Sequence, residues 1–484
     1  MNDKKELQRS LNPMHVWAIA FGCVIGWGSF VNPGKKFLPN SGVAGTAIAM
    51  ILGALVMIII AFSYAYMVPK YPKAGGEFTF TKMCFGKNAA FLCGWFLVAA
   101  YLTNVPMNST AIGLIVDGID GSADILKFGF HYTIAGFDVW MGEMILAMGI
   151  LILFGWLNII GVQKAAIVQT ILSSLLVVCA FTLCITGIIS AKATGINMQP
   201  IWGFDKSAAM AAGATTAEIG KYAHTGTAGI MSAILATFAI APWAYVGFDA
   251  IPQAAEEFNF SFKKVSFIMM VAIIFGCFVY TSNNTVAAAA LANWPDRVMA
   301  GEWVVLVAAE ELLGGFGKVL IGVGVSCAVL SGIMGFYLAS SCLMYSMARE
   351  GYLPKWFGVI NPKYGTPQNA MIFCVIVSLS GPILGREALG WFVDMCAIGA
   401  SIGYFFTSAS TLVSMKRDGD GSSFLKAMAI TGVVFSVAFM ILQLIPIPGL
   451  SDVHFGTESY ILLVVWIVLG LIFYFRERKF FTTE

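Results

Sequence analysis

The sequence predicts an all-α polytopic membrane protein with twelve transmembrane helices. Of its 484 residues, 58% are hydrophobic and only 11% are charged, whereas soluble domains carry about 25% charged residues. Twelve apolar runs follow one another along the chain, each close to the roughly 20 residues that cross a bilayer as a helix. The short connections between them leave no room for a second folded domain.

Gly, Pro and charged residues delimit the expected helices. They lie near residues 14–34, 43–67, 89–114, 140–160, 165–190, 229–256, 264–290, 320–347, 369–385, 390–413, 427–445 and 460–475. The polar segment 1–10 comes before the first helix and is expected to be a retained tail, because it is too polar for a cleaved signal peptide.

The distribution of basic residues predicts the orientation. With residue 1 in the cytoplasm, cytoplasmic segments hold 19 Lys and Arg residues and external segments hold 9. Since cytoplasmic loops carry an excess of these residues, both termini are expected in the cytoplasm, with the protein in the cytoplasmic (plasma) membrane.

Composition argues against several other functions. The formal net charge is +2, without a basic stripe, so nucleic acid is not an expected partner. The ten cysteines contain no C-x-x-C pair, and the four histidines lack ligand spacing, so neither a metal site nor a cofactor is expected. No histidine lies deep in an expected helix, and we therefore expect no enzyme.

Small residues interrupt the first expected helix at 22–30 and the sixth at 242–249. Gly or Pro in corresponding helices of two halves is typical of transporters built from inverted repeats. Gly26 and Gly247 are 221 residues apart, and the ends of helices five and ten, 190 and 413, are 223 apart. We therefore expect two five-helix repeats. The expected organisation is a cytoplasmic tail at 1–10, repeats at 11–190 and 229–413, an external loop at 191–228, and helices eleven and twelve with the C-terminus at 414–484.

An unwound helix in mid-membrane exposes backbone polar groups, which is tolerated only beside a polar cavity. The N-terminal end of a half-helix favours a carboxylate, and a C-terminal end favours a cation. A zwitterion carries both kinds of charge and would fit both kinds of helix end. The alternative is that Gly26, Gly28 and Gly247 only permit close packing or a kink.

Four segments carry a resemblance to a known family. They are GCVIGWGSF at 22–30, YPKAGGEFTF at 71–80, WAYVGFD at 243–249 followed by Glu256 and Glu257, and AREGYLP at 348–354 followed by Thr366 and Pro367. In this order they are similar to motifs of the amino acid–polyamine–organocation (APC) family of amino acid permeases. The resemblance implies the leucine-transporter-type five-plus-five inverted repeat with broken helices 1 and 6, and alternating access. It also implies transport of amino acids or related amines, by symport or antiport.

The resemblance also implies a substrate site at the two interruptions and on helices three, eight and ten. Its residues would be Ile25, Gly26, Trp27, Gly28, Ser29, Tyr101, Asn104, Trp243, Ala244, Tyr245, Gly247, Phe336 and Cys396. Trp243 would be the aromatic gate and Asn104 the amide that contacts substrate, while Phe336 and Cys396 are equally expected to be packing residues. Trp27 departs from the family, which has a small residue there. An inward Trp27 would shrink the pocket, whereas an outward one would only pack against lipid or a neighbouring helix.

Asp249 and Asp394 are acids inside expected helices, where charge is costly. Asp249 lies two residues beyond Gly247 and is expected to gate the inner pathway, answer a substrate ammonium or bind a proton; the alternative is a helix cap. Asp394 lies near a helix end beside Trp391, so a hydrated interfacial acid is as well supported as a gating one.

Ion coupling stays open in the sequence. A fifth-helix lysine that some permeases place where relatives bind a cation is absent from 168–176. Three alternatives remain: sodium held by the Gly22 and Ile25 carbonyls and the Ser331 hydroxyl, proton coupling through Asp249, or exchange without an ion. A channel is disfavoured, because broken helices favour a closed site, and a substrate-sensing receptor of transporter-like fold is a further alternative.

Overall fold

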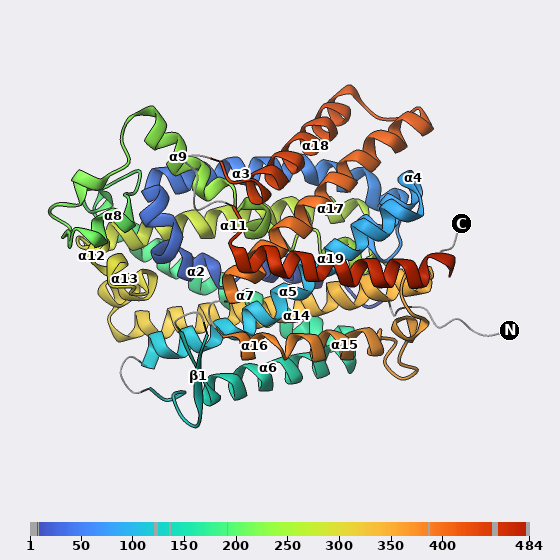
Figure 1. Ribbon diagram of the computed structural model, residues 1–484, viewed down its shortest axis with the longest axis horizontal. Helices are drawn as coiled ribbons and strands as arrows, with labels where there is room; N and C mark the ends of the chain where they lie inside the picture. Colours follow the sequence, from blue (N-terminus) through green and yellow to red (C-terminus); the bar gives the residue numbers. More distant parts are fainter. Residues whose placement is uncertain are drawn as a thin grey trace.

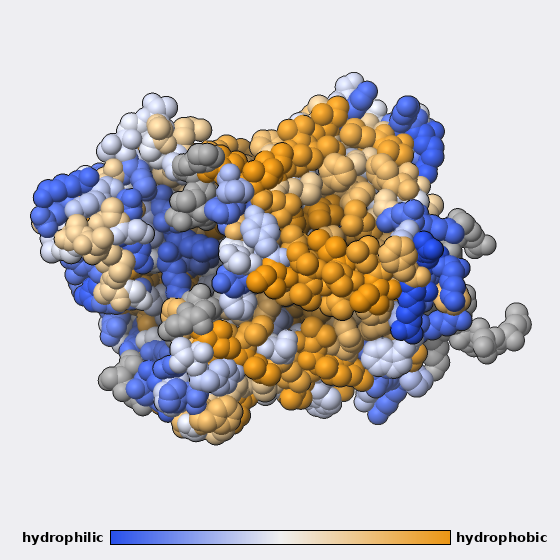
Figure 2. All heavy atoms as spheres, in the orientation of Figure 1, coloured by the Kyte–Doolittle hydropathy of each residue, from blue (hydrophilic) through white to orange (hydrophobic). Residues whose placement is uncertain are grey.

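The molecule is a bundle of long helices that run along its longest axis (Figure 1). The computed structural model describes residues 7, 9–120, 124–134, 137–190, 192–385, 388–447 and 454–480. On the face seen in Figure 2, a broad hydrophobic band separates two hydrophilic ends. A bilayer requires such a band. The chain is therefore a multi-pass membrane protein of mostly helical structure.

The helices follow the apolar runs of the sequence. Up to residue 190 they are α1 (Pro13–Val24), α2 (Gly28–Asn32), the π-helical turn η1 (Pro33–Phe37), α3 (Leu38–Lys70), α4 (Gly76–Phe85), α5 (Lys87–Asp120), α6 (Met141–Ile159) and α7 (Val162–Ile189). From there to residue 299 they are η2 (Gly195–Met198), α8 (Lys206–Ala211), η3 (Ile219–Tyr222), α9 (Gly226–Phe238), α10 (Ala241–Tyr245), η4 (Ile251–Glu257), α11 (Lys263–Ala290) and α12 (Trp294–Met299). The last group is α13 (Val304–Leu313), α14 (Gly315–Arg349), η5 (Lys355–Gly358), α15 (Gln368–Ser378), α16 (Gly381–Leu384), α17 (Ala388–Asp418), α18 (Ser423–Leu444), α19 (Thr457–Glu477) and η6 (Arg478–Phe480).

Ten helical stretches in the described part of the chain are long and apolar enough to cross a bilayer, fewer than the twelve expected. The longest, Pro13–Lys70, has 58 residues, more than twice the roughly 20 that one crossing needs. It contains both the first and the second expected helix. The apolar stretch Gln368–Leu384 is shorter than the others. The count of twelve crossings therefore remains a prediction.

One connection contains strands, which corrects the all-α expectation. β1 (His131–Ile134) and β2 (Phe137–Trp140) pair antiparallel, with His131 opposite Trp140 and Ile134 opposite Phe137. The hairpin lies between α5 and α6 at one end of the bundle (Figure 1). Four-residue strands are too short to give a clear alternating pattern beside apolar helices, which is why the sequence did not predict them.

Both expected helix interruptions are present. α1 ends at Val24 and α2 begins at Gly28, while α10 ends at Tyr245 and η4 begins at Ile251. The two breaks touch each other at Gly247, whose φ is +126°, in the range that favours glycine. A β-carbon there would lie 2.4 Å from the Cys23 Cβ. Only glycine lets the second break pack against the first.

Both described ends of the chain contact the last turns of α14. Leu7 is buried against Ala74 and Tyr345, and a β-carbon on Gly351 would lie 2.2 Å from the Phe480 carbonyl oxygen. α14 also packs along α5, α7 and α1. The two ends of the chain therefore lie at the same end of the bundle.

Candidate functional site

A small cavity lies where the two helix breaks face each other. Its volume is about 10 Å³, close to the roughly 10–15 Å³ that a single water needs. Five of the residues predicted for the substrate site line it: Gly26, Trp27, Asn104, Trp243 and Phe336. The bundle is thus closed around a pocket that holds almost no free volume.

Two further predicted residues lie directly behind this lining. The Asn104 Nδ2 donates to the Cys396 Sγ at 2.9 Å and to the Ala100 carbonyl at 2.7 Å. Both of these hydrogen bonds use the amide nitrogen of Asn104. The Tyr101 ring stacks on Phe336 at a centroid distance of 6.3 Å. Cys396 and Tyr101 therefore support the pocket wall from behind.

The other predicted residues do not line this cavity. They are Ile25, Gly28, Ser29, Ala244, Tyr245 and Gly247. Gly28 packs beneath Trp243, where a β-carbon would lie 2.3 Å from the Cη2 atom. The Tyr245 hydroxyl donates to the Met50 carbonyl at 2.7 Å, so this side chain points towards α3. The Ser29 hydroxyl donates to the Gly26 carbonyl at 3.0 Å and stabilises the break.

Six lining residues were missed by the sequence analysis: Cys23, Val24, Met107, Asn108, Val246 and Tyr280. Asn108 is 2% exposed. Its Nδ2 donates to the Asn104 carbonyl at 2.7 Å, whereas its Oδ1 has no hydrogen-bond partner in the described structure. The spacing of four residues from Asn104 places both amides on one helix face, a signal that could have identified Asn108. No such pattern marks Tyr280.

Trp27 faces the pocket and, with Trp243, separates it from a second cavity. The two rings pack at a centroid distance of 6.1 Å, tilted by 57°. On their other side lies a cavity of about 200 Å³ that includes Asn32, Lys35 and Lys36. Both tryptophans line both cavities. They form a thin partition between the pocket and this second cavity, which we call the vestibule.

Ion pairs join the segment after the second helix break to its neighbours. Arg349, the last residue of α14, binds the Glu256 carboxylate with two hydrogen bonds of 2.6 and 2.9 Å. Glu256 also accepts a hydrogen bond from the Ala74 amide at 3.1 Å. A second ion pair joins Lys82 to Glu350. These contacts tie the segment after the second helix break to α14 and to the loop before α4.

Asp249 connects the second break to another buried acid. Its Oδ1 accepts from the Gly247 amide at 2.7 Å, and its Oδ2 accepts from the Tyr101 hydroxyl at 2.9 Å. The N-cap residue of the following helix η4 is Ala250, without a side-chain hydrogen bond, so Asp249 does not form the helix cap that was the alternative reading of this residue. The same hydroxyl lies 3.4 Å from Oε1 of Glu77 in α4. Asp249 therefore bonds the backbone inside the break and shares a hydrogen-bond donor with Glu77.

Glu77 lies in the segment 71–80 that resembles the permease family, but the sequence predicted no role for it. Its side chain accepts from the Tyr64 hydroxyl at 2.6 Å and from the Gln253 amide. Glu77 and Asp249 are both fully buried, and no ion pair between described residues involves either. Two buried carboxylates without a cation are costly. Burial and the nearby charge of Asp249 raise the pKa of Glu77, so Glu77 retains its proton to a higher pH than a free carboxyl does.

Asp394 lies outside this acid pair. The Ser459 hydroxyl donates to its Oδ2 at 2.6 Å, which joins α17 to α19. Asp394 lines neither of the two cavities beside the helix breaks. This placement suits a local structural contact, and a gating role for Asp394 stays a prediction.

Side chains occupy the neighbourhood of the predicted sodium ligands. The Ser331 hydroxyl lies 3.3 Å from the Gly22 carbonyl oxygen and 3.0 Å from that of Ala328. One turn earlier in α1, the Ala18 carbonyl accepts from Gln169 at 3.1 Å and from Ser173 at 2.8 Å. Protein donors therefore already satisfy carbonyl groups near the end of α1.

Helix breaks that face each other across a closed pocket inside a membrane bundle are typical of secondary transporters. A family model described as amino acid permease matches residues 11–472. The chain belongs to this family, and the APC resemblance is confirmed.

Named relatives agree with the family. An uncharacterized transporter of Rhizobium meliloti is 25% identical over 99% of this chain and 94% of its own length. The large neutral amino acids transporter small subunit 2 of Homo sapiens is 27% identical over 77% of this chain and 64% of its own length. The Asc-type amino acid transporter 1 of Mus musculus is 26% identical with the same coverage, 77% and 64%. The chain thus spans under two thirds of the length of these two mammalian relatives.

Replacing Trp27 by alanine is expected to widen the range of accepted substrates, because it removes a ring that fills the pocket. The KM for bulky amino acids should fall by roughly tenfold relative to small ones. Competition of a size-graded amino acid panel against uptake measures this. Trp356→Ala, at an exposed position, is the control; unchanged selectivity with loss of folded protein would indicate that Trp27 only packs.

Asn104→Ala is expected to raise the substrate KM by roughly tenfold or more, because a hydrogen bond to a charged ligand is lost. Asn158→Ala is a matched control: the Asn158 Nδ2 likewise donates to a carbonyl, at 2.9 Å, and to a sulfur atom, at 3.2 Å, but it lines none of the three described cavities. Uptake kinetics in reconstituted vesicles compare the two. Equal KM changes would contradict a direct contact by Asn104.

Glu77→Gln is expected to flatten the pH dependence of thermal stability. A carboxyl whose pKa is raised by folding contributes stability that is lost as the pH rises from its ordinary value through the raised one. The wild-type melting temperature should therefore decrease between about pH 5 and about pH 8, and uptake should change over the same window. Asp249→Asn should also reduce this dependence, whereas Glu310→Gln, at an exposed site, should preserve it. A wild-type profile in both the Glu77 and the Asp249 variants would refute titration of Glu77 in this pH range.

Proposed function

We propose that the protein moves amino acids or related amines across the cytoplasmic membrane by alternating access. The observation that supports this proposal best is a pocket at two facing helix breaks, with a different set of side-chain contacts on each side of it. The Trp27–Trp243 partition adjoins the vestibule, and the Glu256–Arg349 ion pair would close the other end. If only one of these two contacts opened at a time, the pocket would be exposed to only one side of the membrane at a time.

The proposal includes the finer architecture expected from the sequence. Ten of twelve helices would form five-helix repeats at 11–190 and 229–413, and the last two would follow at 414–484, with both termini in the cytoplasm. The facing breaks and the positions of the two chain ends support this arrangement. In this orientation the vestibule is external, and the structure corresponds to a state closed towards the cytoplasm.

The pocket offers groups that suit an amino acid backbone. The Ile25, Ser29 and Phe30 amides donate to backbone carbonyls, whereas the Gly26 and Trp27 amides make no such bond to described residues. Free amides at the start of a half-helix favour a carboxylate. Nearby, the unpaired Asn108 oxygen, 3.9 Å from a β-carbon position on Gly26, is an acceptor for an ammonium group. The names of the mammalian relatives support amino acids as substrates.

Exchange without sodium is the form of transport that the surroundings of α1 favour. Ser331 lies within hydrogen-bond distance of the Gly22 carbonyl, and Gln169 and Ser173 satisfy the Ala18 carbonyl. Carbonyls bonded to protein donors have less need of a cation. Gln169 lies on α7, within the stretch where the lysine is absent, and its amide is a neutral donor beside Gly22.

The decisive experiment is counterflow in proteoliposomes. A thermal-shift screen of amino acids and amines first identifies a ligand by its stabilisation of the folded protein. Vesicles loaded with that ligand should then accumulate labelled ligand from outside, at the same rate in sodium and in choline. Binding without counterflow would indicate a sensor. Counterflow that requires sodium would keep the transporter assignment and refute sodium-independent exchange.

A further inference from the structure

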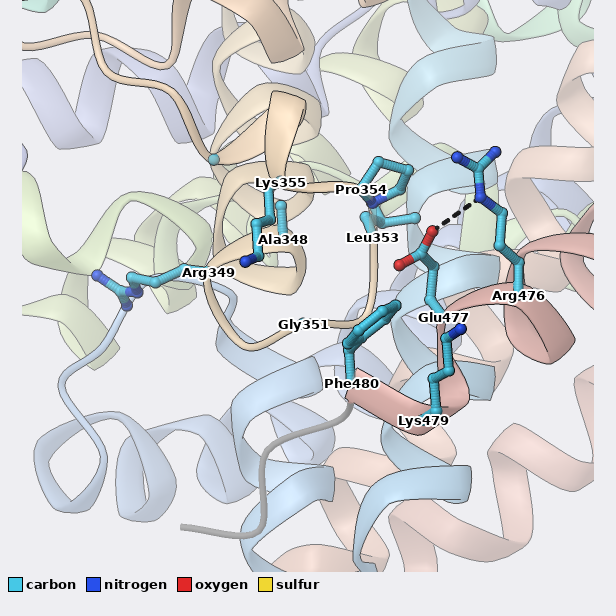
Figure 3. A pocket seen from close by; sticks show the side chains of 11 residues that line it. Ala348, Arg349, Gly351, Leu353, Pro354, Lys355, Arg476, Glu477, Lys479 and Phe480 are labelled. Carbon is cyan, nitrogen blue, oxygen red and sulfur yellow. Dashed lines mark ion pairs between the residues drawn. The ribbon is translucent and has the colours of Figure 1, made fainter.

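A third cavity lies at the end of the bundle where α14 and α19 finish (Figure 3). Its volume is about 900 Å³, and it shares no lining residue with the two cavities at the helix breaks. One wall is the segment around the end of α14 and η5, and the other is the end of α19 with η6. The mechanism proposed above does not use it.

The two walls of this cavity are in close contact with each other. Gly351 has φ of +81° and approaches the Phe480 carbonyl so closely that a β-carbon would lie 2.2 Å from it. Glu477 is only 7% exposed and pairs with Arg476 at 3.2 Å. The cavity is thus a defined feature between segments more than a hundred residues apart in the sequence.

The lining has an excess of positive charge. Four basic residues and one acid, Glu477, line it. Glu477 offsets Arg476, and the Arg349 guanidinium points away from the cavity (Figure 3) to Glu256. Lys355 and Lys479 remain, and neither forms an ion pair with an acid among the described residues. Within the described part of the chain, the two opposite walls therefore each contribute one lysine without an ion-pair partner.

The cavity borders the lipid-facing surface. α19 carries exposed apolar side chains directly before it, with Ile472 58% and Phe475 60% exposed. Figure 2 shows the hydrophobic band ending in strongly hydrophilic residues at this end of the molecule. Trp356, beside Lys355, is also exposed, and tryptophan is enriched where a membrane meets water.

We propose that this cavity binds the phosphate headgroup of an anionic phospholipid, such as phosphatidylglycerol, between Lys355 and Lys479. The acyl chains would lie along the apolar face of α19. Basic pockets at this depth bind anionic headgroups, and in the proposed orientation the adjoining leaflet is the cytoplasmic one, which carries such lipids. A bound headgroup would bridge α19 to the α14 end that carries Arg349, and so stabilise the closed inner end.

The test measures melting temperatures of the purified full-length protein in detergent with three probes: short-chain phosphatidylglycerol, short-chain phosphatidylcholine and inorganic phosphate. Phosphatidylglycerol should give the largest increase, since a ligand of the folded state stabilises it. In Lys355→Gln/Lys479→Gln its apparent affinity should fall by roughly thirtyfold, because each lysine near a membrane surface contributes about a factor of five.

Lys263→Gln/Lys264→Gln is the matched control, because it removes two exposed lysines at the start of α11 and should keep the wild-type affinity. Should the cavity variant be poorly folded, Lys355→Gln alone, at an exposed site, is compared by native mass spectrometry of retained lipid. An equal shift with phosphatidylcholine, an equal shift with inorganic phosphate, or undiminished lipid binding in the cavity variants would each overturn the proposal.

Discussion

Backbone polar groups in the middle of a membrane must find partners inside the protein, and the structure around residues 22–30 and 242–249 depends on this constraint. Short-range contacts meet much of the demand: Ser29 bonds the Gly26 carbonyl, and Asp249 bonds the Gly247 amide. The remaining free groups face a closed pocket. Packing of Gly247 against Cys23 brings the two breaks together, so the geometry of both breaks and of the pocket between them depends on the same few residues.

Much of the fold was predictable because the hydrocarbon core of the membrane requires an apolar run of similar length in every helix that crosses it. Apolar length located the long helices to within a few residues, and glycine clusters located both breaks. The shorter helices α4, α8, α12 and α13 lie in segments that were expected to be connections. The β1–β2 hairpin was missed because its strands have only four residues each. The count of crossings is less direct, since Pro13–Lys70 forms one continuous stretch in which breaks and turns replace clear loops.

The candidate site was predictable only where a motif marks it. Gly26, Trp27 and Trp243 belong to such motifs, whereas Tyr280 and Met107 reach the pocket through packing of distant helices, which no local pattern encodes. The pairing of Glu77 with Asp249 is of the same kind, because 172 residues separate them. Tyr245 illustrates the opposite case: it lies within a motif, yet its hydroxyl bonds the Met50 carbonyl on α3.

Tyr101 has two ends with different neighbours. Its ring stacks on Phe336 in the pocket wall, and its hydroxyl bonds Asp249 beside Glu77. An aromatic side chain is rigid, so displacement of Phe336 by a larger ligand would disturb the hydrogen bonds of the acids. Linkage between two binding equilibria is reciprocal. If substrate binding changes the proton affinity of these acids through the Tyr101 ring, then the pH must change the substrate affinity by the same factor. A single tyrosine would then make the affinity of the protein depend on the pH of the compartment that its pocket faces.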